Sequence, residues 1–562
     1  MLARLLAAAM ILASSSTASA SSSAPTAHLF PLPSEPITVE TILMPFDDNN
    51  VAHTMSWDVL DAMNALREEL HDAGFTMEGI AGVMHSIISP STDTGGWKRE
   101  ALHTPLYLYN LEDLISKLES IDHAVYKERV VKLSSRLGLL VRLFYMGQWV
   151  LKRDLEALAV TVPLLSDDAM RTLNSLGLFF FAESPVGTIV RSEIMFNALA
   201  PAGSILAPLI LATDHYMLPS YEISYDPVMY LGIDSYALVG AAPRPQKGTT
   251  ILDTCTGSGV QGIAASAFCA VSGGECSLLL NDLNPRAVRF ARFNLAMNFH
   301  ALPGLLRPKR PAKRQSINEL SIWLRESVWL SDITTLASAV EAGKEGPLAL
   351  RFHAGFDLML ANPPYLPDPR GGCELYGGGG DIGDDILLEV VKAAAGRRNA
   401  SHGLLKRASG TNLAIVGNVA NINSLSARLQ TAWSCDDDDD DDRSQQRIDA
   451  QVVHAHGTIF PTREYAKMRM RSTFEWGIEE SLEKTASAYH EVGIVDVSPH
   501  SLLFFQNRYH TQGTRDTGSE KITLPCWNYK SLDLGGALWE RVSGMHGGLN
   551  HAKARAAIYQ LL

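Results

Sequence analysis

The sequence of 562 residues predicts an α/β fold, in which a mixed sheet of seven strands follows a helix-rich N-terminal domain. Three observations predict this fold. The short apolar run 249–252 leads directly into a glycine loop and then into a helix rich in small residues at 260–270. Further apolar runs of strand length follow at 277–280, 356–361 and 413–419, whereas helical periodicity dominates the region before residue 220.

The glycine loop, residues 253–259, has the context of a nucleotide-binding turn. Gly257 and Gly259 tolerate positive φ angles and let the backbone approach a ligand closely. The next strand ends at Asp282, where an acidic side chain can accept hydrogen bonds from ribose hydroxyls. With Gly262 the loop also matches the G-x-G-x-x-G spacing of dinucleotide enzymes, so it does not decide between NAD and S-adenosylmethionine.

Asn362, Pro363, Pro364 and Tyr365 form an Asn-Pro-Pro-Tyr motif that closes the strand pattern 356–361. The Asn362 side-chain oxygen and the Pro363 carbonyl can accept the two N–H bonds of a planar amino group, which localises the nitrogen lone pair for attack on an electrophile. The prolines fix φ, so these acceptors are set before a substrate arrives, and the Tyr365 ring can stack on the planar group. Hydride transfer has no use for such a pair of acceptors, so the motif favours S-adenosylmethionine.

Taken together, residues 253–259, 281–285, 331–333 and 362–365 resemble the four landmarks of class I S-adenosylmethionine-dependent methyltransferases, which have a Rossmann-like fold. They are most similar to the "methyltransferase small" group. That group includes the release-factor glutamine N5-methyltransferases and the related N6-adenine and N2-guanine enzymes. The resemblance covers a domain of about 221–510 and implies S-adenosyl-L-methionine as the cofactor.

The resemblance also implies roles for individual residues. Asp253 would lie under the methionine moiety, Asp282 would bind the ribose, and Asp332 would lie near the adenine. Asn362 and Tyr365, with Pro363 and Pro364 between them, would clamp the target nitrogen. The complete set of cofactor-binding residues implied in this way is Asp253, Cys255, Thr256, Gly257, Ser258, Gly259, Asp282, Leu283, Asp332, Ile333 and Asn362.

Two departures from the family pattern and two alternatives accompany these roles. Cys255 stands where the loop usually has its first glycine, and the interval between Asp282 and Asp332 is lengthened by an insertion. Asp253 and Asp282 could instead be simple caps at strand ends. Asp332 could be the N-cap of a helix, because a Ser-Asp pair is common there.

The charge of the chain bears on its partners. The formal net charge of −13 argues against broad electrostatic binding of nucleic acid. A local exception is the insertion 301–320, where five basic residues between Arg307 and Arg314 could contact RNA or an acidic protein; the alternative is a solvated insertion. The acidic loop 434–447 contains an unbroken aspartate run at 436–442, and we expect no preorganised metal site there or elsewhere.

The N-terminus indicates a signal or organelle-targeting peptide in residues 1–20. Arg4 precedes the apolar stretch 5–13, and the small residues 18–20 offer a cleavage site. Residues 21–54 are predicted to be a linker. A secretory signal fits the segment best. Because S-adenosylmethionine is made inside cells, we expect an organelle as the destination of a soluble mature protein, with a wrongly assigned start site as the alternative.

Cysteine usage and hydropathy add two expectations. The six cysteines show neither a CxxC pair nor a disulfide-like spacing, so no disulfide is expected. The apolar run 137–151 is short and contains Arg142, so no transmembrane span is expected.

The helix-rich region 55–220 is predicted to recognise the substrate, with a helical lid as the alternative. Its segment 140–147 resembles part of an uncharacterised bacterial methyltransferase group, in which a winged-helix-like domain precedes the same catalytic fold. Tyr225 lies on the bridge to the catalytic domain and is a candidate cofactor contact. The expected helices are 57–70, 111–118, 124–146 and 167–177.

The segments after the motif are less informative. Glu374 and the tract 377–381 either shape a substrate loop or form a flexible surface loop, and Cys373 carries no sign of activation. The last two strands of the sheet, 492–497 and 502–505, are predicted to form a hairpin. Residues 511–562 are a C-terminal extension to which we assign no chemistry.

Three classes of function fit these observations. We expect an N-methyltransferase whose preferred substrate is a protein glutamine amide, for example on a translation factor. The alternative is an RNA or DNA exocyclic-amine methyltransferase, acting on adenine N6 or guanine N2. A non-catalytic cofactor-binding module is a further alternative, against which the intact motif and Asp282 argue. The acidic charge favours a protein, and no aromatic-basic pattern typical of a pocket for a flipped base is present.

Overall fold

The computed structural model describes most of the central part of the chain. Apart from short gaps inside them, the described ranges are 57–83, 135–159, 174–199, 208–214, 227–305, 317–342, 352–396, 403–433, 446–455, 459–472, 479–509 and 527–534, with residues 43, 46 and 47. The chain divides into two compact units. Unit 1 comprises Met1–Pro45, Asp58–Leu199 and Ala212–Tyr225, and unit 2 comprises Phe46–Trp57, Ala200–Leu211 and Asp226–Leu562.

Unit 1 mixes helices with strands in its described part. Strand β3 pairs with β1 on one side and β2 on the other, antiparallel in both cases. The Phe144 ring packs 4.8 Å from that of Phe196, and Arg136 pairs with the buried Glu69, so apolar and ionic contacts both hold the unit together. The elements are α3 (Trp57–Asp72), α7 (Arg136–Leu140), π-helix η5 (Val141–Tyr145), β1 (Val150–Leu151), α8 (Lys152–Ala159), β2 (Phe179–Ser184), β3 (Gly187–Ser192) and β4 (Met195–Leu199).

The helices expected in this region have different outcomes. Helix α3 confirms the one predicted from 57, and it ends two residues later than expected. Helices α7 and η5 account for the described end of the predicted helix 124–146. The predicted helix 111–118 and most of 167–177 lie outside the described residues. Because β1 to β4 lie here as well, the helix-rich composition predicted for this region is not confirmed.

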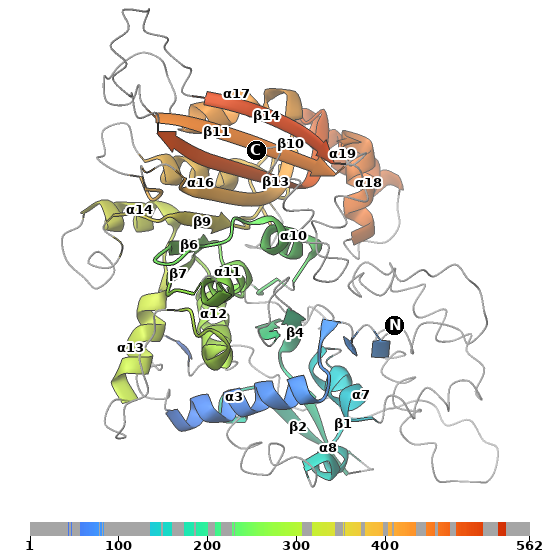
Figure 1. Cartoon of the computed structure of the whole chain (residues 1–562). Coiled ribbons are helices and arrows are strands. Elements are labelled where there is room, and N and C mark those ends of the chain that lie inside the picture. The colour runs from blue at the N-terminus through green and yellow to red at the C-terminus, as the bar shows by residue number, and fades with distance from the viewer. Residues whose placement is uncertain are drawn as a thin grey trace, which may run out of the picture. The chain divides into compact units, whose positions relative to one another are not determined.

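Unit 2 is built on a nine-stranded sheet (Figure 1). The strand order is β14-β11-β13-β10-β9-β6-β7-β8, and β12 pairs with β13 beside this path. The strands are β6 (Thr250–Thr254), β7 (Ser277–Asp282), β8 (Val328–Leu330), β9 (Leu358–Ala361), β10 (Asn412–Ala420), β11 (Gln446–Ala455), β12 (Phe460–Pro461), β13 (Asp496–Tyr509) and β14 (Trp527–Leu534). A further strand, β5 (Leu209–Thr213), spans the boundary between the units.

The central strands of this sheet are parallel. Strand β6 pairs in parallel with β7 and with β9, and β9 pairs in parallel with β10. The chain therefore leaves β6 toward β7 and β8 on one side and returns to β9 on the other side. In parallel α/β sheets, ligands bind at the carboxyl ends of the strands where the order reverses in this way. Here that position lies between β6 and β9, which precede the glycine loop and the Asn-Pro-Pro-Tyr motif.

Helices cover both faces of the sheet. On one face, the buried side chains of α14, α16 and α17 form a single apolar cluster with β6, β7, β9, β10, β11 and β13. On the other face, α11 contacts β6, β7 and β9, and α10 contacts β10 and β13. The helices of unit 2 are α10 (Ile233–Ala241), α11 (Val260–Val271), α12 (Pro285–Met297), 3-10 helix η7 (Phe299–Ala301), α13 (Ile317–Ser327), α14 (Ile333–Ala342), α16 (Asp385–Ala395), α17 (Ile422–Trp433), α18 (Thr462–Ser472) and α19 (Glu479–Glu491).

The sheet corrects the predicted number of strands. The hairpin expected from 492–497 and 502–505 is wrong, because β13 runs through both segments as one strand of 14 residues. The residues between the two segments, which predicted a turn, form a local irregularity within β13. There His500 has a φ of 54°, and the pairing with β10 shifts register. Strands β11, β12 and β14 were not predicted. Strand β14 pairs with β11 and lies in the segment to which no chemistry was assigned.

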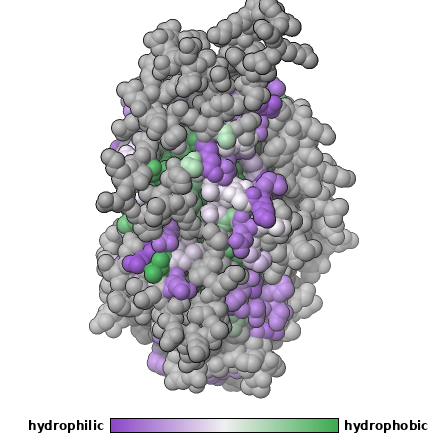
Figure 2. All heavy atoms as spheres, turned by 60° about the vertical axis from the view of Figure 1, so that its left-hand side comes forward, coloured by the Kyte–Doolittle hydropathy of each residue, from purple (hydrophilic) through white to green (hydrophobic). Residues whose placement is uncertain are grey.

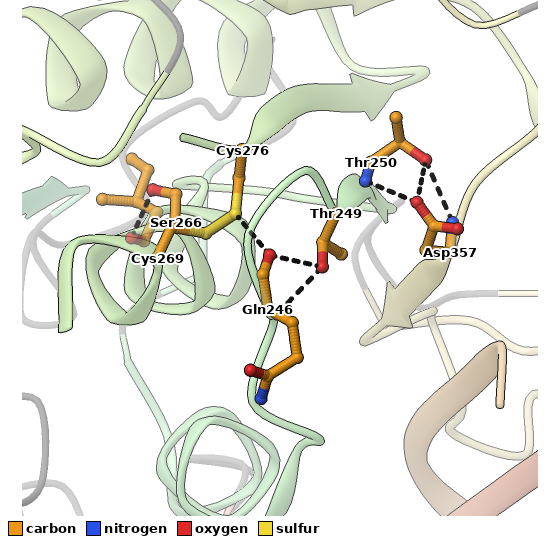
Figure 3. The surroundings of a disulfide bond; sticks show 8 residues. Gln246, Thr249, Thr250, Ser266, Cys269, Cys276 and Asp357 are labelled. Carbon is orange, nitrogen blue, oxygen red and sulfur yellow. Dashed lines mark hydrogen bonds between the residues drawn. A yellow bond between two sulfur atoms is a disulfide. The ribbon is translucent and has the colours of Figure 1, made fainter. Parts of the chain in front are cut away.

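The structure also corrects the expectation of no disulfide. Cys269 on α11 is bonded to Cys276 just before β7 (Figure 3). The turn after α11 returns the chain to the sheet and brings the two Cα atoms to 6.0 Å, a usual separation for a disulfide. The bond therefore connects the helix that follows the glycine loop with the strand that ends at Asp282. Among the described cysteines, Cys255 is free.

Hydrophobic side chains are scattered on the described surface. The large ones that are exposed are Leu283, Ile322, Ile459 and Val495. Figure 2 shows that the described surface on one face is mostly hydrophilic, with small and separate hydrophobic areas. No helix in the described ranges is long and apolar enough to cross a membrane.

Several predicted segments lie outside the described residues. They are the targeting peptide 1–20, the aspartate run 436–442, the basic cluster Arg307–Arg314, Tyr225, Cys373 and Glu374.

Candidate functional site at the carboxyl ends of β6, β7 and β9

The glycine loop follows β6 and turns sharply into α11. Gly257 and Gly259 have φ angles of 53° and 83°, as the sequence predicted for a tight turn. Cys255 has a φ of 53°, so it adopts the left-handed conformation of the glycine that it replaces. A Cβ atom at Gly257 would meet nothing within 4 Å, whereas one at Gly259 would contact Ile263 and Leu280. Gly257 therefore faces open space, and Gly259 allows α11 to pack closely on β7.

Asp253 is the most buried acidic group of the loop. Its Oδ2 atom accepts hydrogen bonds from Thr256 Oγ1 at 2.6 Å and from the Gly262 backbone N–H at 2.8 Å. Its Oδ1 atom is buried and has no hydrogen-bond partner in the described part of the chain. Burial raises the pKa of Asp253 to about 7, and the negative charge of Asp282 contributes to the rise. The Oδ2 atom thus caps the loop, as the alternative of a strand-end cap predicted. The Oδ1 atom is left without a hydrogen-bond partner among the described residues.

Asp282, at the end of β7, is hydrogen-bonded to the glycine loop. Its Oδ2 atom accepts from the Gly257 N–H at 2.8 Å, and its Oδ1 atom accepts from the Asn284 N–H at 2.9 Å. Burial raises the pKa of Asp282, although the side chain is partly exposed at the sheet edge. Leu283, beside it, is 54% exposed and offers an apolar surface next to the carboxylate. Both oxygens of Asp282 thus accept backbone hydrogen bonds, as the alternative of a strand-end cap predicted, and contacts with a ribose or an adenine stay predictions.

Asp332 lies between β8 and α14, directly before the first residue of α14. It accepts hydrogen bonds from the Thr335 backbone N–H at 2.8 Å and from the hydroxyls of Thr334 and Thr335. These hydrogen bonds hold its pKa below the usual range. The arrangement is that of an N-cap, which was the alternative reading. Ile333 is buried in the apolar cluster of the sheet, so a direct cofactor contact by either residue stays a prediction.

The Asn-Pro-Pro-Tyr motif leaves β9 beside the glycine loop. Strands β6 and β9 pair Asp253 with Leu360 and Thr254 with Ala361, so Asn362 follows at the same edge as Cys255. The Asn362 Nδ2 atom donates to Asp234 Oδ2 at 2.8 Å and lies 3.4 Å from Ser235 Oγ. The Asn362 Oδ1 atom is buried, with no hydrogen-bond partner among the described residues. The acceptor that the sequence analysis assigned to a substrate amine is therefore not used by any residue that the structure describes.

The Tyr365 side chain is buried and fixed from two sides. Its hydroxyl donates to Asp234 Oδ2 at 3.0 Å, and its ring meets the His500 ring edge to face, with centroids 6.3 Å apart. Burial lowers the pKa of His500, while the charge of Asp234 opposes this shift. The His500 backbone N–H donates to the Asn418 side chain at 3.0 Å, which holds the irregularity of β13 in place.

The glycine tract after the motif packs against the Tyr365 backbone. A Cβ atom at Gly379 would lie 2.8 Å from Tyr365 Cα, and one at Gly383 would lie 2.7 Å from the Tyr365 carbonyl oxygen. Leu366 exchanges backbone hydrogen bonds with Gly377 and Gly379 on either side. Gly379 in the tract and Gly383 just after it therefore permit a close backbone approach around the motif, and a substrate loop shaped by the tract stays a prediction.

Three residues of this site were not assigned a role from the sequence. Asp234 and Ser235 lie in the first turn of α10, more than 120 positions before the motif, and His500 lies more than 130 positions after it. The sequence signal was slight: Asp234 belongs to the segment Gly232-Ile233-Asp234 on the bridge before the catalytic domain. No local spacing relates these residues to Asn362.

Neither a protein-family model nor a curated protein matches the sequence. Solved structures with a similar arrangement include a putative transferase from Pyrococcus horikoshii, at 9% identity and a TM-score of 0.28 over 67% of this chain and 99% of that one. A predicted O-methyltransferase from Agrobacterium tumefaciens aligns at 11% identity and a TM-score of 0.26, over 56% and 96% of the two chains. An S-adenosylmethionine-dependent methyltransferase from Geobacter sulfurreducens, in complex with S-adenosyl-L-homocysteine, aligns at 10% identity and a TM-score of 0.20, over 52% and 95%. These superpositions carry no argument about chemistry, which rests on the site.

Proposed function

We propose that the chain is an S-adenosylmethionine-dependent N-methyltransferase that acts on a planar amino group, with a protein glutamine amide as its preferred substrate. The observation that carries the proposal is the buried and unpartnered Oδ1 atom of Asn362. An acceptor left buried without a partner costs about 1–3 kcal/mol, so a site that keeps one is expected to satisfy it with a ligand. The donor that fits this acceptor is an N–H group.

The residues of the glycine loop fit the proposed cofactor. The unused Asp253 Oδ1 atom suits the cationic amino end of S-adenosylmethionine, and Asp282 suits the ribose hydroxyls. Gly257 leaves space above the loop, since no atom would meet a Cβ there. When bound, this cofactor supplies an electrophilic methyl group.

The motif would act on the substrate by positioning and polarising it. Asn362 Oδ1 and the Pro363 carbonyl would each accept one N–H bond of the amino group, which leaves its lone pair directed out of the amide plane. The two prolines keep these acceptors in place without a loss of flexibility on binding. The net charge of −13 favours a protein over a nucleic acid as the molecule that carries the amino group.

Transfer of labelled methyl groups from S-adenosylmethionine to fractionated cellular protein and RNA pools tests the proposal. We expect label in the protein pool, in an amide-bearing residue that is identified as methylglutamine by mass spectrometry. Label in the RNA pool alone would replace the protein substrate with an exocyclic amine. Absence of label from both pools, with intact cofactor binding by calorimetry, would contradict N-methylation.

A further inference from the structure

We infer that Asp234 is a positioning residue, whose carboxylate fixes the Asn362 side chain so that its oxygen faces the substrate. The inference rests on the proposed function, because it concerns the amine acceptor of the same site. Asp234 lies in the first turn of α10 and is 1% exposed. Its Oδ2 atom accepts hydrogen bonds from the Asn362 side-chain amide at 2.8 Å and from the Tyr365 hydroxyl at 3.0 Å.

The two ends of an asparagine side chain differ in their hydrogen-bonding roles. A side-chain amide has a donor end and an acceptor end of almost the same shape, so packing alone does not select which end faces a site. A carboxylate only accepts, so it selects the Nδ2 end of Asn362. The Oδ1 end is then left to face away, buried and unpartnered among the described residues. A flipped Asn362 would present donors to a substrate N–H group and repel it.

Asp234 also couples the two side chains of the motif. Because one oxygen atom accepts from both Asn362 and Tyr365, a displacement of the carboxylate would disturb the acceptor and the aromatic ring together. The His500 ring meets the Tyr365 ring edge to face, and the charge of Asp234 opposes the lowering of the His500 pKa by burial. This shared dependence is what separates a positioning residue from an ordinary helix-terminal acid.

The Asp234 carboxylate occupies the space beside Gly232 that a larger side chain would fill. A Cβ atom at Gly232 would lie 2.2 Å from Asp234 Oδ1 and 3.3 Å from its Cγ. Gly232 has φ −88° and ψ 175°, which alanine adopts without strain, so a methyl group there would act only by displacing the carboxylate. Gly232→Ala thus moves Asp234 without changing its chemistry.

The experiment compares full-length variants in the labelled methyl transfer assay, with the substrate pool that the wild-type protein labels. Asp234→Asn keeps the size of the side chain but allows Asn362 to flip, and Gly232→Ala displaces the carboxylate. We expect kcat to fall about 10²-fold in both, the usual effect of misplacing a reacting group by about 1 Å. Tyr365→Phe keeps the hydrogen bond between Asp234 and Asn362, so its kcat should fall less. Glu319→Gln, also in the first turn of a helix, is the matched control and should retain wild-type activity.

Two further measurements separate positioning from a structural role. The affinity for S-adenosyl-L-homocysteine and the thermal midpoint of Asp234→Asn should stay close to those of the wild type. If Asp234→Asn retained wild-type kcat, or if cofactor affinity and stability fell in parallel with kcat, the inference would be wrong. If the wild-type protein labelled neither pool, the proposed function would fail, whereas the inference would be decided by the measurement described next.

The orientation of Asn362 can be observed without a substrate. In protein labelled with ¹⁵N-asparagine, the signal that disappears in Asn362→Ala identifies its side-chain amide. We expect these amide protons to exchange slowly with solvent in the wild type and at least about tenfold faster in Asp234→Ala, because the buried acceptor is removed. Equal exchange rates in the two proteins would show that Asp234 does not hold Asn362, whatever the outcome of the transfer assay.

Discussion

The glycine loop and the Asn-Pro-Pro-Tyr motif lie at neighbouring strand ends, but they are held in place differently. The loop is held by groups that are closer in sequence: Asp253 accepts hydrogen bonds from Thr256 and Gly262, three and nine residues away, and Asp282 accepts from the Gly257 N–H, 25 residues away. The motif is fixed by Asp234 and His500, each more than 120 residues away. The glycine loop can be recognised from its local sequence, whereas the orientation of the Asn362 side chain depends on distant elements that only the fold brings together.

The two regions also keep different atoms unsatisfied. In the loop the unused acceptor is a carboxylate oxygen whose pKa is raised, and in the motif it is a neutral amide oxygen. We expect the first region to respond to pH and to cations, and the second to respond to the shape of a neutral amino group. The predictions below test this difference, beginning with the largest expected effect.

Asp253→Asn should make stability less dependent on pH. A carboxyl group whose pKa is raised from 3.8 to about 7 on folding keeps its proton in the folded state, so stability falls as pH rises from about 4 to about 7. The full shift corresponds to at most about 4 kcal/mol, at about 1.4 kcal/mol per pKa unit. Unfolding by urea at pH 4, 5.5, 7 and 8 should show the wild type losing stability relative to the variant. A constant difference across this range would contradict the raised pKa.

Asn362→Ala should change turnover and leave cofactor binding nearly intact. Loss of one preorganised partner of the reacting group typically costs about 10²–10³ in rate. The measurement is single-turnover methyl transfer, with calorimetry of cofactor binding beside it. Asn412→Ala is the control, because that amide donates only to the carbonyl of Gly410, at the start of β10. Wild-type turnover in Asn362→Ala would remove the basis of the proposed function.

Asp282→Ala should weaken S-adenosylmethionine binding by about 10–100-fold, the range expected for losing hydrogen bonds to a charged group. The variant also loses the acceptor for the Gly257 N–H, so the loop and the ribose site are affected together. Asp332→Ala provides the comparison. If Asp332 only caps α14, that variant should lose about 1 kcal/mol of stability and no affinity. Equal losses of S-adenosylmethionine affinity in the Asp282→Ala and Asp332→Ala variants would support the predicted contact between Asp332 and the adenine.

The sequence predicted the central strands because their patterns are local. Strands β6, β7, β9 and β10 are short apolar runs bounded by polar or glycine residues, and each forms within a few residues of its expected place. Strand β11 was missed because it contains Asp449, Gln451 and His454 and follows the acidic run directly. Its partners, β13 and β14, are distant in sequence, so no local pattern shows that these polar residues enter the sheet.

The candidate site shows the same limit. The residue types of the glycine loop and of the end of β7 could be predicted because a tight turn requires glycine and a strand end presents an acid, whereas their contacts with a cofactor stay a prediction. The role of Asp234 could not be predicted, since one aspartate in the first turn is ordinary at a helix start. The disulfide between Cys269 and Cys276 was missed for a related reason: its formation depends on the turn that follows α11.

Cys255→Gly should have the smallest effect of the series and should act only on the loop. Cys255 has a φ of 53°, which costs a residue with a Cβ atom roughly 1–2 kcal/mol. Glycine removes this strain but gains more freedom in the unfolded chain, so we expect a net stabilisation of about 0.5–1 kcal/mol. Chemical denaturation measures the stability, and the affinity for S-adenosyl-L-homocysteine should stay equal or rise as the approach to the loop opens. Cys255→Ala is the matched control, because it removes the thiol and keeps the strain. If alanine stabilised the protein as much as glycine did, the thiol rather than the backbone would be responsible, and the loop would not be strained by its departure from the family pattern.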